Sequence, residues 1–165
     1  MTVYLDGDSC PKPVRELVAR SCRRENVDLV CFANRPIPFE ETWVKMKVVE
    51  ENPGAADDAI VENSAEGDLV MTRDIPLAAR LVDKGVSVVN DRGTVYSKEN
   101  VRERLSLRDF MEELRTSGLK PESTSSYGTK EWNAFVRSWD KEFMRLVRQS
   151  RSRSEQGVGR TLGKL

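Results

Sequence analysis

Two aspartates, Asp6 and Asp8, stand one residue apart immediately after an apolar run at residues 2–5. The β-branched and aromatic side chains of that run predict a strand, and Pro13 is typical of a first helical turn. The two acids therefore lie where a strand turns into a helix. Ligands of open α/β sheets bind at this edge, so the carboxylates are candidates for chemistry, while Asp8 could equally cap the helix.

The same pattern recurs further along the chain. Residues 67–74 carry an apolar strand that runs into Asp74, before a helix that opens with isoleucine and proline. A short helix predicted over residues 56–65 carries Asp57 and Asp58 in its first turn, where acids also complement the helix dipole. Because the carboxyl ends of neighbouring parallel strands meet at one edge, Asp74 is expected beside the first pair of acids. Asp57 or Asp58 can join them there.

This concentration of acids predicts a metal site. Crowded carboxylates repel one another unless a divalent cation neutralises them, and hard oxygen ligands suit Mg²⁺ or Mn²⁺. We therefore expect one or two such ions. Two ions roughly 4 Å apart can activate a water and stabilise the leaving oxygen in phosphodiester cleavage, with no need for histidine. Four basic residues are predicted on loops around this cleft, where each could contact a nucleic-acid phosphate or simply be solvated: Lys12, Arg35, Arg73 and Arg92.

Composition narrows the chemistry further. The 165 residues include no histidine, which excludes Ser-His-Asp and Cys-His catalysis and any histidine-ligated zinc or iron site. The three cysteines, Cys10, Cys22 and Cys31, show neither a C-x-x-C pair nor zinc-ligand spacing, so we expect reduced thiols. No apolar run approaches the roughly 18 residues that span a bilayer, so the sequence predicts a cytoplasmic protein without membrane association.

The order of the elements predicts the fold class. Further strands are expected at residues 29–33, 43–49 and 86–89, with helices between them. Two more helices are expected to begin at Ser97 and at Ser106. Strands that alternate with helices in this way predict an α/β fold, namely a three-layer α/β/α sandwich around a mainly parallel sheet.

The chain divides by charge and composition. Residues 1–119, the expected α/β domain, carry 17 basic and 22 acidic residues, whereas the rest of the chain carries 10 basic and 5 acidic. Residues 120–128 have linker composition, and residues 149–165 are expected to be a disordered basic tail. Between them, residues 129–148 predict an amphipathic helix that docks on the domain or on a second subunit, as in a homodimer. Its apolar stripe consists of Trp132, Phe135, Val136, Trp139, Phe143, Leu146 and Val147.

Several stretches together carry a family resemblance. They are "DGDSCP" near the start, "ADDAIVENSAEGDLVMTRDIPLAARLVDKG" in the middle, and then "NDRGTVY" and "RERLSLRDFMEELRTSG". Over about residues 1–119 the chain resembles the bacterial YaiI/YqxD family, which is similar in fold to the PIN and NYN nucleases. The resemblance implies a PIN-like sandwich with an acidic cleft that binds Mg²⁺ or Mn²⁺.

The resemblance also implies roles for particular acids. In PIN-like enzymes the first acid ends the first strand, as Asp6 does, and the second precedes an isoleucine in a central helix, as Asp57 does in "DDAI". A third follows a strand in a T-x-D turn, as Asp74 does, and a fourth can be placed at Asp8 or Asp91. The implied catalytic residues are Asp6, Asp57 and Asp74, and the implied metal ligands are these three with Asp8, followed by Asp58 and Asp91.

These observations predict a metal-dependent nuclease, with RNA rather than DNA as the expected substrate. The main alternative is a PIN-like module that binds RNA or a protein without turnover. A phosphatase with an aspartate nucleophile also fits the opening Asp-x-Asp, but its downstream Gly-Asp would have to be Gly67 and Asp68. Their spacing from Asp74 does not match, and Asp68 opens a strand. Cys10 at a helix N-terminus suggests thiol chemistry, yet neither a histidine base nor a partner cysteine accompanies it.

Overall fold

The computed structural model describes residues 1–120 and 126–162, with side chains of the last helix described up to residue 157. Within these residues, five strands form one sheet in which all neighbours are parallel. The strands lie in the order β3-β2-β1-β4-β5. In chain order they are β1 (Thr2–Asp6), β2 (Asp28–Ala33), β3 (Lys45–Val48), β4 (Leu69–Met71) and β5 (Ser87–Val89).

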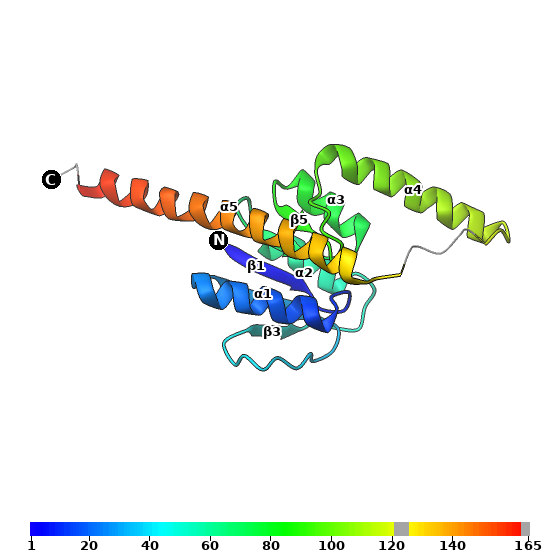
Figure 1. Ribbon diagram of the computed structural model, residues 1–165, viewed down its shortest axis with the longest axis horizontal. Helices are drawn as coiled ribbons and strands as arrows, with labels where there is room; N and C mark the ends of the chain where they lie inside the picture. The colour runs from blue at the N-terminus through cyan, green and yellow to red at the C-terminus, as the bar shows by residue number, and fades with distance from the viewer. Residues whose placement is uncertain (121–125, 163–165) are drawn as a thin grey trace.

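Helices cover both faces of this sheet (Figure 1). α1 and α5 pack on one face, and α2, α3 and α4 on the other. In the described part of the chain, no helix is long and apolar enough to cross a membrane. The helices are α1 (Lys12–Glu25), α2 (Ala55–Asn63), α3 (Ile75–Asp83), α4 (Lys98–Thr116) and α5 (Thr129–Leu162).

The central strand β1 explains the three layers. Val3 and Leu5 belong to the apolar cluster under α1 and α5, whereas Tyr4 belongs to the cluster under α2 and α3. This alternation follows from the pleat, which points successive side chains to opposite faces. Because both faces of β1 are covered, its residues from Val3 to Asp6 are all buried, and those before Asp6 are apolar or aromatic. The predicted α/β sandwich with a parallel sheet is confirmed.

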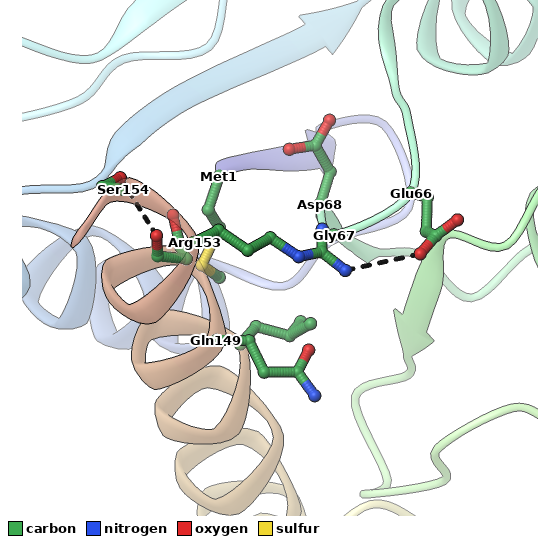
Figure 2. A pocket seen from close by; sticks show the side chains of 9 residues that line it. Met1, Glu66, Gly67, Asp68, Gln149, Arg153 and Ser154 are labelled. Carbon is green, nitrogen blue, oxygen red and sulfur yellow. Dashed lines mark hydrogen bonds and ion pairs between the residues drawn. The ribbon is translucent and has the colours of Figure 1, made fainter. Parts of the chain in front are cut away.

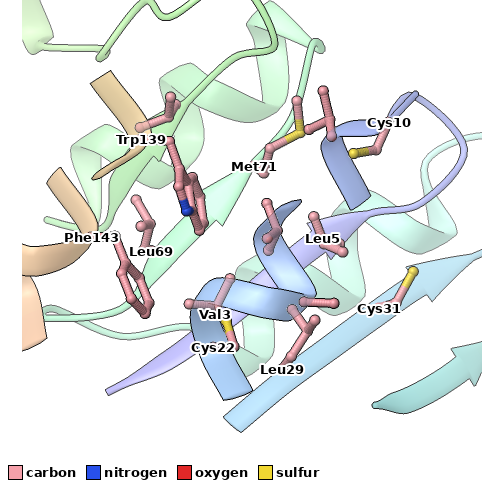
Figure 3. Packing of buried hydrophobic residues seen from close by; sticks show 14 of the residues in the cluster. Val3, Leu5, Cys10, Cys22, Leu29, Cys31, Leu69, Met71, Trp139 and Phe143 are labelled. Carbon is pink, nitrogen blue, oxygen red and sulfur yellow. The ribbon is translucent and has the colours of Figure 1, made fainter. Parts of the chain in front are cut away.

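The aromatic stripe of α5 lies inside this domain. Phe135, Trp139 and Phe143 are at most 1% exposed and pack against the sheet, where Leu69 is a neighbour of the two latter rings (Figure 3). The indole Nε1–H of Trp139 donates a hydrogen bond to Ser21 Oγ of α1 at 3.2 Å. Of the two docking modes expected for this helix, the structure has the one in which the stripe packs on its own domain.

Beyond the stripe, α5 continues further than expected. The prediction of disorder over residues 149–165 is wrong as far as Leu162, because the helix runs to that residue. The arginine, glutamine and glutamate residues of this stretch are good helix formers, and Arg151 Nη2 lies 3.0 Å from Glu25 Oε2 at the end of α1. Residues 163–165 and most of the predicted linker at 120–128 lie outside the described residues.

α4 is one helix and not the predicted two. It begins with a capping box in which Ser97 Oγ accepts from the Asn100 N–H at 3.1 Å and Asn100 Oδ1 accepts from the Ser97 N–H at 2.8 Å. Ser106 lies in the middle of the helix and caps nothing. The residues around it are strong helix formers, so the helix continues through Ser106 although the sequence there resembles an N-cap.

Candidate functional site

The strand order creates a crevice at one edge of the sheet. The chain runs outward from β1 through β2 to β3 and then returns to β4 on the other side of β1. Loops that follow β1 and β4 therefore part in opposite directions, which is where open α/β sheets bind ligands. A cavity of about 470 Å³ lies at this edge. Four acids from three parts of the chain line it, with Ser9, Asn34 and Arg73: Asp6, Asp8, Asp57 and Asp74.

Asp6, the last residue of β1, is the most buried of these acids, with 5% of its surface exposed. Its Oδ2 accepts hydrogen bonds from Thr72 Oγ1 and from Ser9 Oγ, both at 2.7 Å. Burial raises the pKa of the Asp6 carboxyl above its ordinary value, the two hydroxyl donors oppose that shift, and the charges of Asp74 and Asp8 add to it. A cation in the cavity would relieve this electrostatic cost.

Thr72 links Asp6 to Asp74. It follows β4, and its Oγ1 donates to Asp6 while accepting from the Asp74 N–H at 3.0 Å. Asp74 in turn is the N-cap of α3, where its Oδ1 accepts from the Leu77 N–H at 2.8 Å. The hydroxyl of Thr72 and that of Ser9 thus hold the ends of β1 and β4 together. Neither residue was among the predicted site residues, although Thr72 stands in the T-x-D turn that pointed to Asp74.

Asp8 and Asp57 approach the cavity from its other sides. Asp8 Oδ2 accepts from the Asn34 N–H at 2.8 Å, which ties the loop after β1 to the end of β2. Asp57 lies in the first turn of α2. Partial burial, followed by the charges of Asp74 and Asp6, raises the pKa of Asp57 from 3.8 to about 6. Residues far apart in sequence therefore act electrostatically on one another across the cavity.

Each acid keeps oxygen atoms available. Asp6 Oδ1, Asp8 Oδ1 and Asp74 Oδ2 form no hydrogen bond with the described residues, and neither does either oxygen of Asp57. Among these residues, however, no three acidic or thiol side chains are grouped closely enough to ligate one metal ion as they stand. Mg²⁺ is commonly held by one or two carboxylates, with waters and substrate phosphates completing its shell. Hard oxygen donors lining a 470 Å³ cavity fit that mode.

The two weaker candidate ligands lie outside the cavity lining. The side chain of Asp58 is 63% exposed and its Oδ1 lies 2.9 Å from Arg80 Nη1 of α3. Asp91 is 4% exposed, and its Oδ2 lies 3.4 Å from Nε of Arg73, which does line the cavity. Asp91 thus contacts the cavity only through the arginine that it pairs with.

Of the four predicted phosphate-contacting residues, only Arg73 lines the cavity. Lys12 pairs with Glu16 at 3.6 Å and borders a separate pocket on α1. The Arg92 guanidinium lies over the ring of Tyr127 at 5.6 Å. Arg35 is exposed and is absent from the described lining of the cavity. The cavity lining therefore contains four of the predicted acids but only one of the predicted basic residues.

The two minor alternatives do not fit this geometry. Asp68 lies at the opposite, amino edge of the sheet, where it accepts hydrogen bonds from the Thr2 N–H at 2.7 Å and the Ala65 N–H at 3.0 Å. It borders a different pocket of about 290 Å³ beside α5 and Arg153 (Figure 2), so it cannot join Asp6 as a phosphatase pair would require. Cys10 is buried, and burial raises the pKa of its thiol well above the ordinary value, which disfavours a reactive thiolate.

The raised pKa of Asp57 predicts a pH dependence of stability in metal-free protein. Its folded-state pKa of about 6 exceeds the ordinary 3.8, so the folded chain binds the proton more tightly than the unfolded chain. This contribution is complete below about pH 4 and is lost as the pH rises through about 6. Because Asp57 is only partly buried and water screens its charge, Asp57→Asn is expected to raise the free energy of unfolding at pH 7 by only about 1 kcal/mol.

Urea unfolding in EDTA at about pH 4 and pH 7 measures this effect. The variant and the native protein should differ at the higher pH and converge at the lower one. Asp58→Asn is the matched control, because Asp58 is exposed and paired with Arg80 outside the cavity. Equal pH profiles for the two variants would contradict the assigned environment of Asp57.

Comparison with known proteins relates this chain to bacterial relatives. Residues 4–145 match the family described as uncharacterised BCR, YaiI/YqxD family. The UPF0178 protein of Treponema pallidum is 48% identical over 157 residues, which cover 93% of this chain and 87% of the relative. That of Treponema denticola is 44% identical over 149 residues, covering 90% of this chain and 96% of the relative. The one from Trichlorobacter lovleyi is 38% identical over 152 residues, covering 92% and 99%.

The extent of these matches agrees with the packing of α5. The family match continues past residue 119, where the resemblance had been expected to end, and reaches well into the helix that supplies Trp139 to the core. No solved structure matches the chain significantly. The expected likeness to PIN nucleases therefore remains a prediction.

Proposed function

The chain belongs to the YaiI/YqxD family, and we propose that this member is a metal-dependent nuclease that hydrolyses phosphodiester bonds in RNA. The observation that carries the proposal is the convergence of Asp6, Asp8, Asp57 and Asp74 on one cavity at the switch point of a parallel sheet. With no histidine in the chain, carboxylates are the natural groups for such chemistry.

Asp6 and Asp74 are the residues that would hold Mg²⁺ or Mn²⁺. Both line the cavity, both keep one carboxylate oxygen free, and Thr72 fixes each relative to the other. Such an ion, when bound, polarises the phosphoryl group and lowers the pKa of a water. Ser9 and Thr72 keep Asp6 oriented through their two hydrogen bonds to its Oδ2, which leaves Oδ1 as the ligating atom.

Asp57 and Arg73 have separate roles in this proposal. Asp57 lines the same cavity with both oxygens free, so either oxygen can accept the proton of the attacking water. The Arg73 side chain is 53% exposed and lines the cavity while Asp91 holds its Nε. Its remaining guanidinium N–H groups are available to bind a substrate phosphate in a bidentate manner.

The decisive experiment is metal-dependent cleavage. Purified protein is incubated with labelled single-stranded RNA, hairpin RNA and DNA of the same sequences, each in Mn²⁺, Mg²⁺ and EDTA. We expect RNA products in Mn²⁺ and Mg²⁺ and none in EDTA, because the acids cannot promote hydrolysis without the cation. Intact RNA in all three conditions would contradict the proposal.

A second function is favoured by one specific observation. Within the described residues the acids do not form a ready three-carboxylate ligand set, which suits a module that binds RNA or protein without turnover. Such a module would retain RNA equally in EDTA and in Mn²⁺ and leave it uncut. The same assay therefore separates the two functions, because only the nuclease needs the cation.

A further inference from the structure

A groove lies between α1 and α5. These two helices cover the same face of the sheet (Figure 1). Its volume is about 480 Å³. The helices are held side by side there by the Trp139–Ser21 hydrogen bond and by an ion pair between Arg24 and Asp140 at 3.5 Å. We call this feature the α1–α5 groove, and its charged lining consists of Arg20, Arg24, Arg137, Asp140 and Lys141.

The charges of the α1–α5 groove are strongly unbalanced. Four cations face one acid, although the whole chain carries 27 residues of each sign. Arg24 pairs with Asp140, whereas the side chains of Arg20, Arg137 and Lys141 form no ion pair or hydrogen bond with any described residue. Exposed cations that no acid neutralises create a positive potential that attracts a polyanion.

The cations are also regularly spaced. Arg20 and Arg24 stand four residues apart on α1, and Arg137 and Lys141 stand four residues apart on α5. Residues at this spacing are neighbours on a helix surface, with about 5–6 Å between their Cβ atoms. The groove therefore presents two short rows of positive charge facing each other, as a phosphate backbone running between them would require.

The floor of the groove restricts how a ligand is recognised. Trp139 lines it but is only 1% exposed, and its indole N–H is already bonded to Ser21. The ring is therefore closed to stacking with a nucleobase, which needs an exposed aromatic face. Leu17 and Val136 add apolar surface to the lining. The charged side chains of the groove suit the phosphates of a polynucleotide, and contacts to phosphates do not distinguish its bases.

The groove and the carboxylate cavity lie along one helix. α1 begins at Lys12, directly after the loop that contributes Asp8 and Ser9 to the cavity. Arg20 is eight residues further along α1, which corresponds to about 12 Å at 1.5 Å per residue. A polynucleotide whose reacting bond lies in the cavity can thus continue along α1 into the groove.

We propose that the α1–α5 groove binds the phosphate backbone of a single-stranded polynucleotide through Arg20, Arg137 and Lys141. This inference deepens the proposed function, on which it rests, by assigning a second binding region to the same substrate. It is sequence-independent binding, and it does not require a metal ion.

The test is the salt dependence of RNA binding in EDTA, which prevents cleavage. Affinity for a labelled oligouridylate is measured by fluorescence anisotropy between about 50 and 200 mM salt. Each phosphate that the protein no longer neutralises should reduce the slope of log affinity against log salt by about 0.7 for a single strand. The triple variant Arg20→Gln, Arg137→Gln, Lys141→Gln should therefore reduce the slope by about 2. Glutamine retains helix propensity, so α1 and α5 should remain folded, as circular dichroism would verify.

A matched control removes the same charge elsewhere. Lys98, Arg102 and Arg115 are exposed on α4 and have no ion pair with the described residues, so Lys98→Gln, Arg102→Gln, Arg115→Gln should leave the slope unchanged. An equal reduction in both triple variants, or none in the groove variant, would overturn the proposal, as would absence of RNA binding by the native protein. A reduced slope in the groove variant of a protein that never cleaves RNA would support the groove while refuting the nuclease. Metal-dependent RNA cleavage together with an unaltered slope in the groove variant would support the nuclease and refute the groove.

Discussion

Asp6→Asn is expected to reduce Mn²⁺-dependent RNA cleavage by more than about a hundredfold, since even residues behind metal ligands typically contribute 10–100-fold. Asparagine has the same shape as aspartate and retains a carbonyl oxygen, so it can still accept from Thr72 Oγ1 and Ser9 Oγ. The substitution therefore removes the negative charge while leaving the link between β1 and β4 in place.

The stability of the same variant distinguishes loss of a metal ligand from loss of the fold. Burial and two neighbouring carboxylates raise the pKa of Asp6, so removing its charge should not lower the free energy of unfolding at neutral pH. Cleavage rates and urea unfolding are measured together, with Asp58→Asn as the control from outside the cavity. If Asp6→Asn cleaves RNA at the full rate, or if Asp58→Asn reduces cleavage equally, the carboxylate cavity is not the catalytic site.

Gly93→Ala is expected to lower the free energy of unfolding by about 3 kcal/mol or more. Gly93 has a φ of +82°, and a Cβ atom there would collide with the backbone oxygen of Ala134 and lie 2.9 Å from the backbone nitrogen of Phe135. Backbone atoms cannot rotate away, so the turn after β5 or the start of α5 must shift. Because Phe135 is fully buried, that shift would disturb the core.

Gly118→Ala provides a control at a glycine with almost the same φ angle. Gly118 has a φ of +80°, and nothing lies within 4 Å of a Cβ atom built there. The strain of the left-handed conformation alone should cost about 1 kcal/mol. Urea unfolding of both variants isolates the contact between the turn and α5. Equal decreases in stability would mean that Gly93 is required only for its φ angle.

Local sequence patterns predicted those residues of the candidate site that stand at the end of a strand. Asp6 and Asp74 follow apolar strands, and adjacency of their strands then places them together. The choice between Asp57 and Asp58 could not be made from residue types, because both acids suit the first turn of a helix. The three-dimensional structure distinguishes them, because Asp57 lies within range of the charges of the other acids and Asp58 pairs with Arg80.

Long-range hydrogen bonds and tertiary contacts could not be predicted from local sequence patterns. The bond from Thr72 to Asp6 joins residues 66 positions apart, and no local signal encodes it. The continuation of α5 past residue 148 was missed for a related reason, because that stretch lacks apolar periodicity and is held by single charges such as Arg151. The aromatic stripe was visible, but whether it met its own sheet or a second subunit depended on the three-dimensional arrangement.

The position of α5 in the chain has a consequence for synthesis. Together with α1 this helix buries one face of the sheet, yet it is translated after all five strands. Translation proceeds at about 5–20 residues per second, so Trp139 and Phe143 are synthesised several seconds or more after β1 and β4. During that interval apolar residues such as Leu69 lack the cover that α5 provides in the folded protein. A chain that ends before residue 129 would lack α5 altogether and would keep this part of the core exposed.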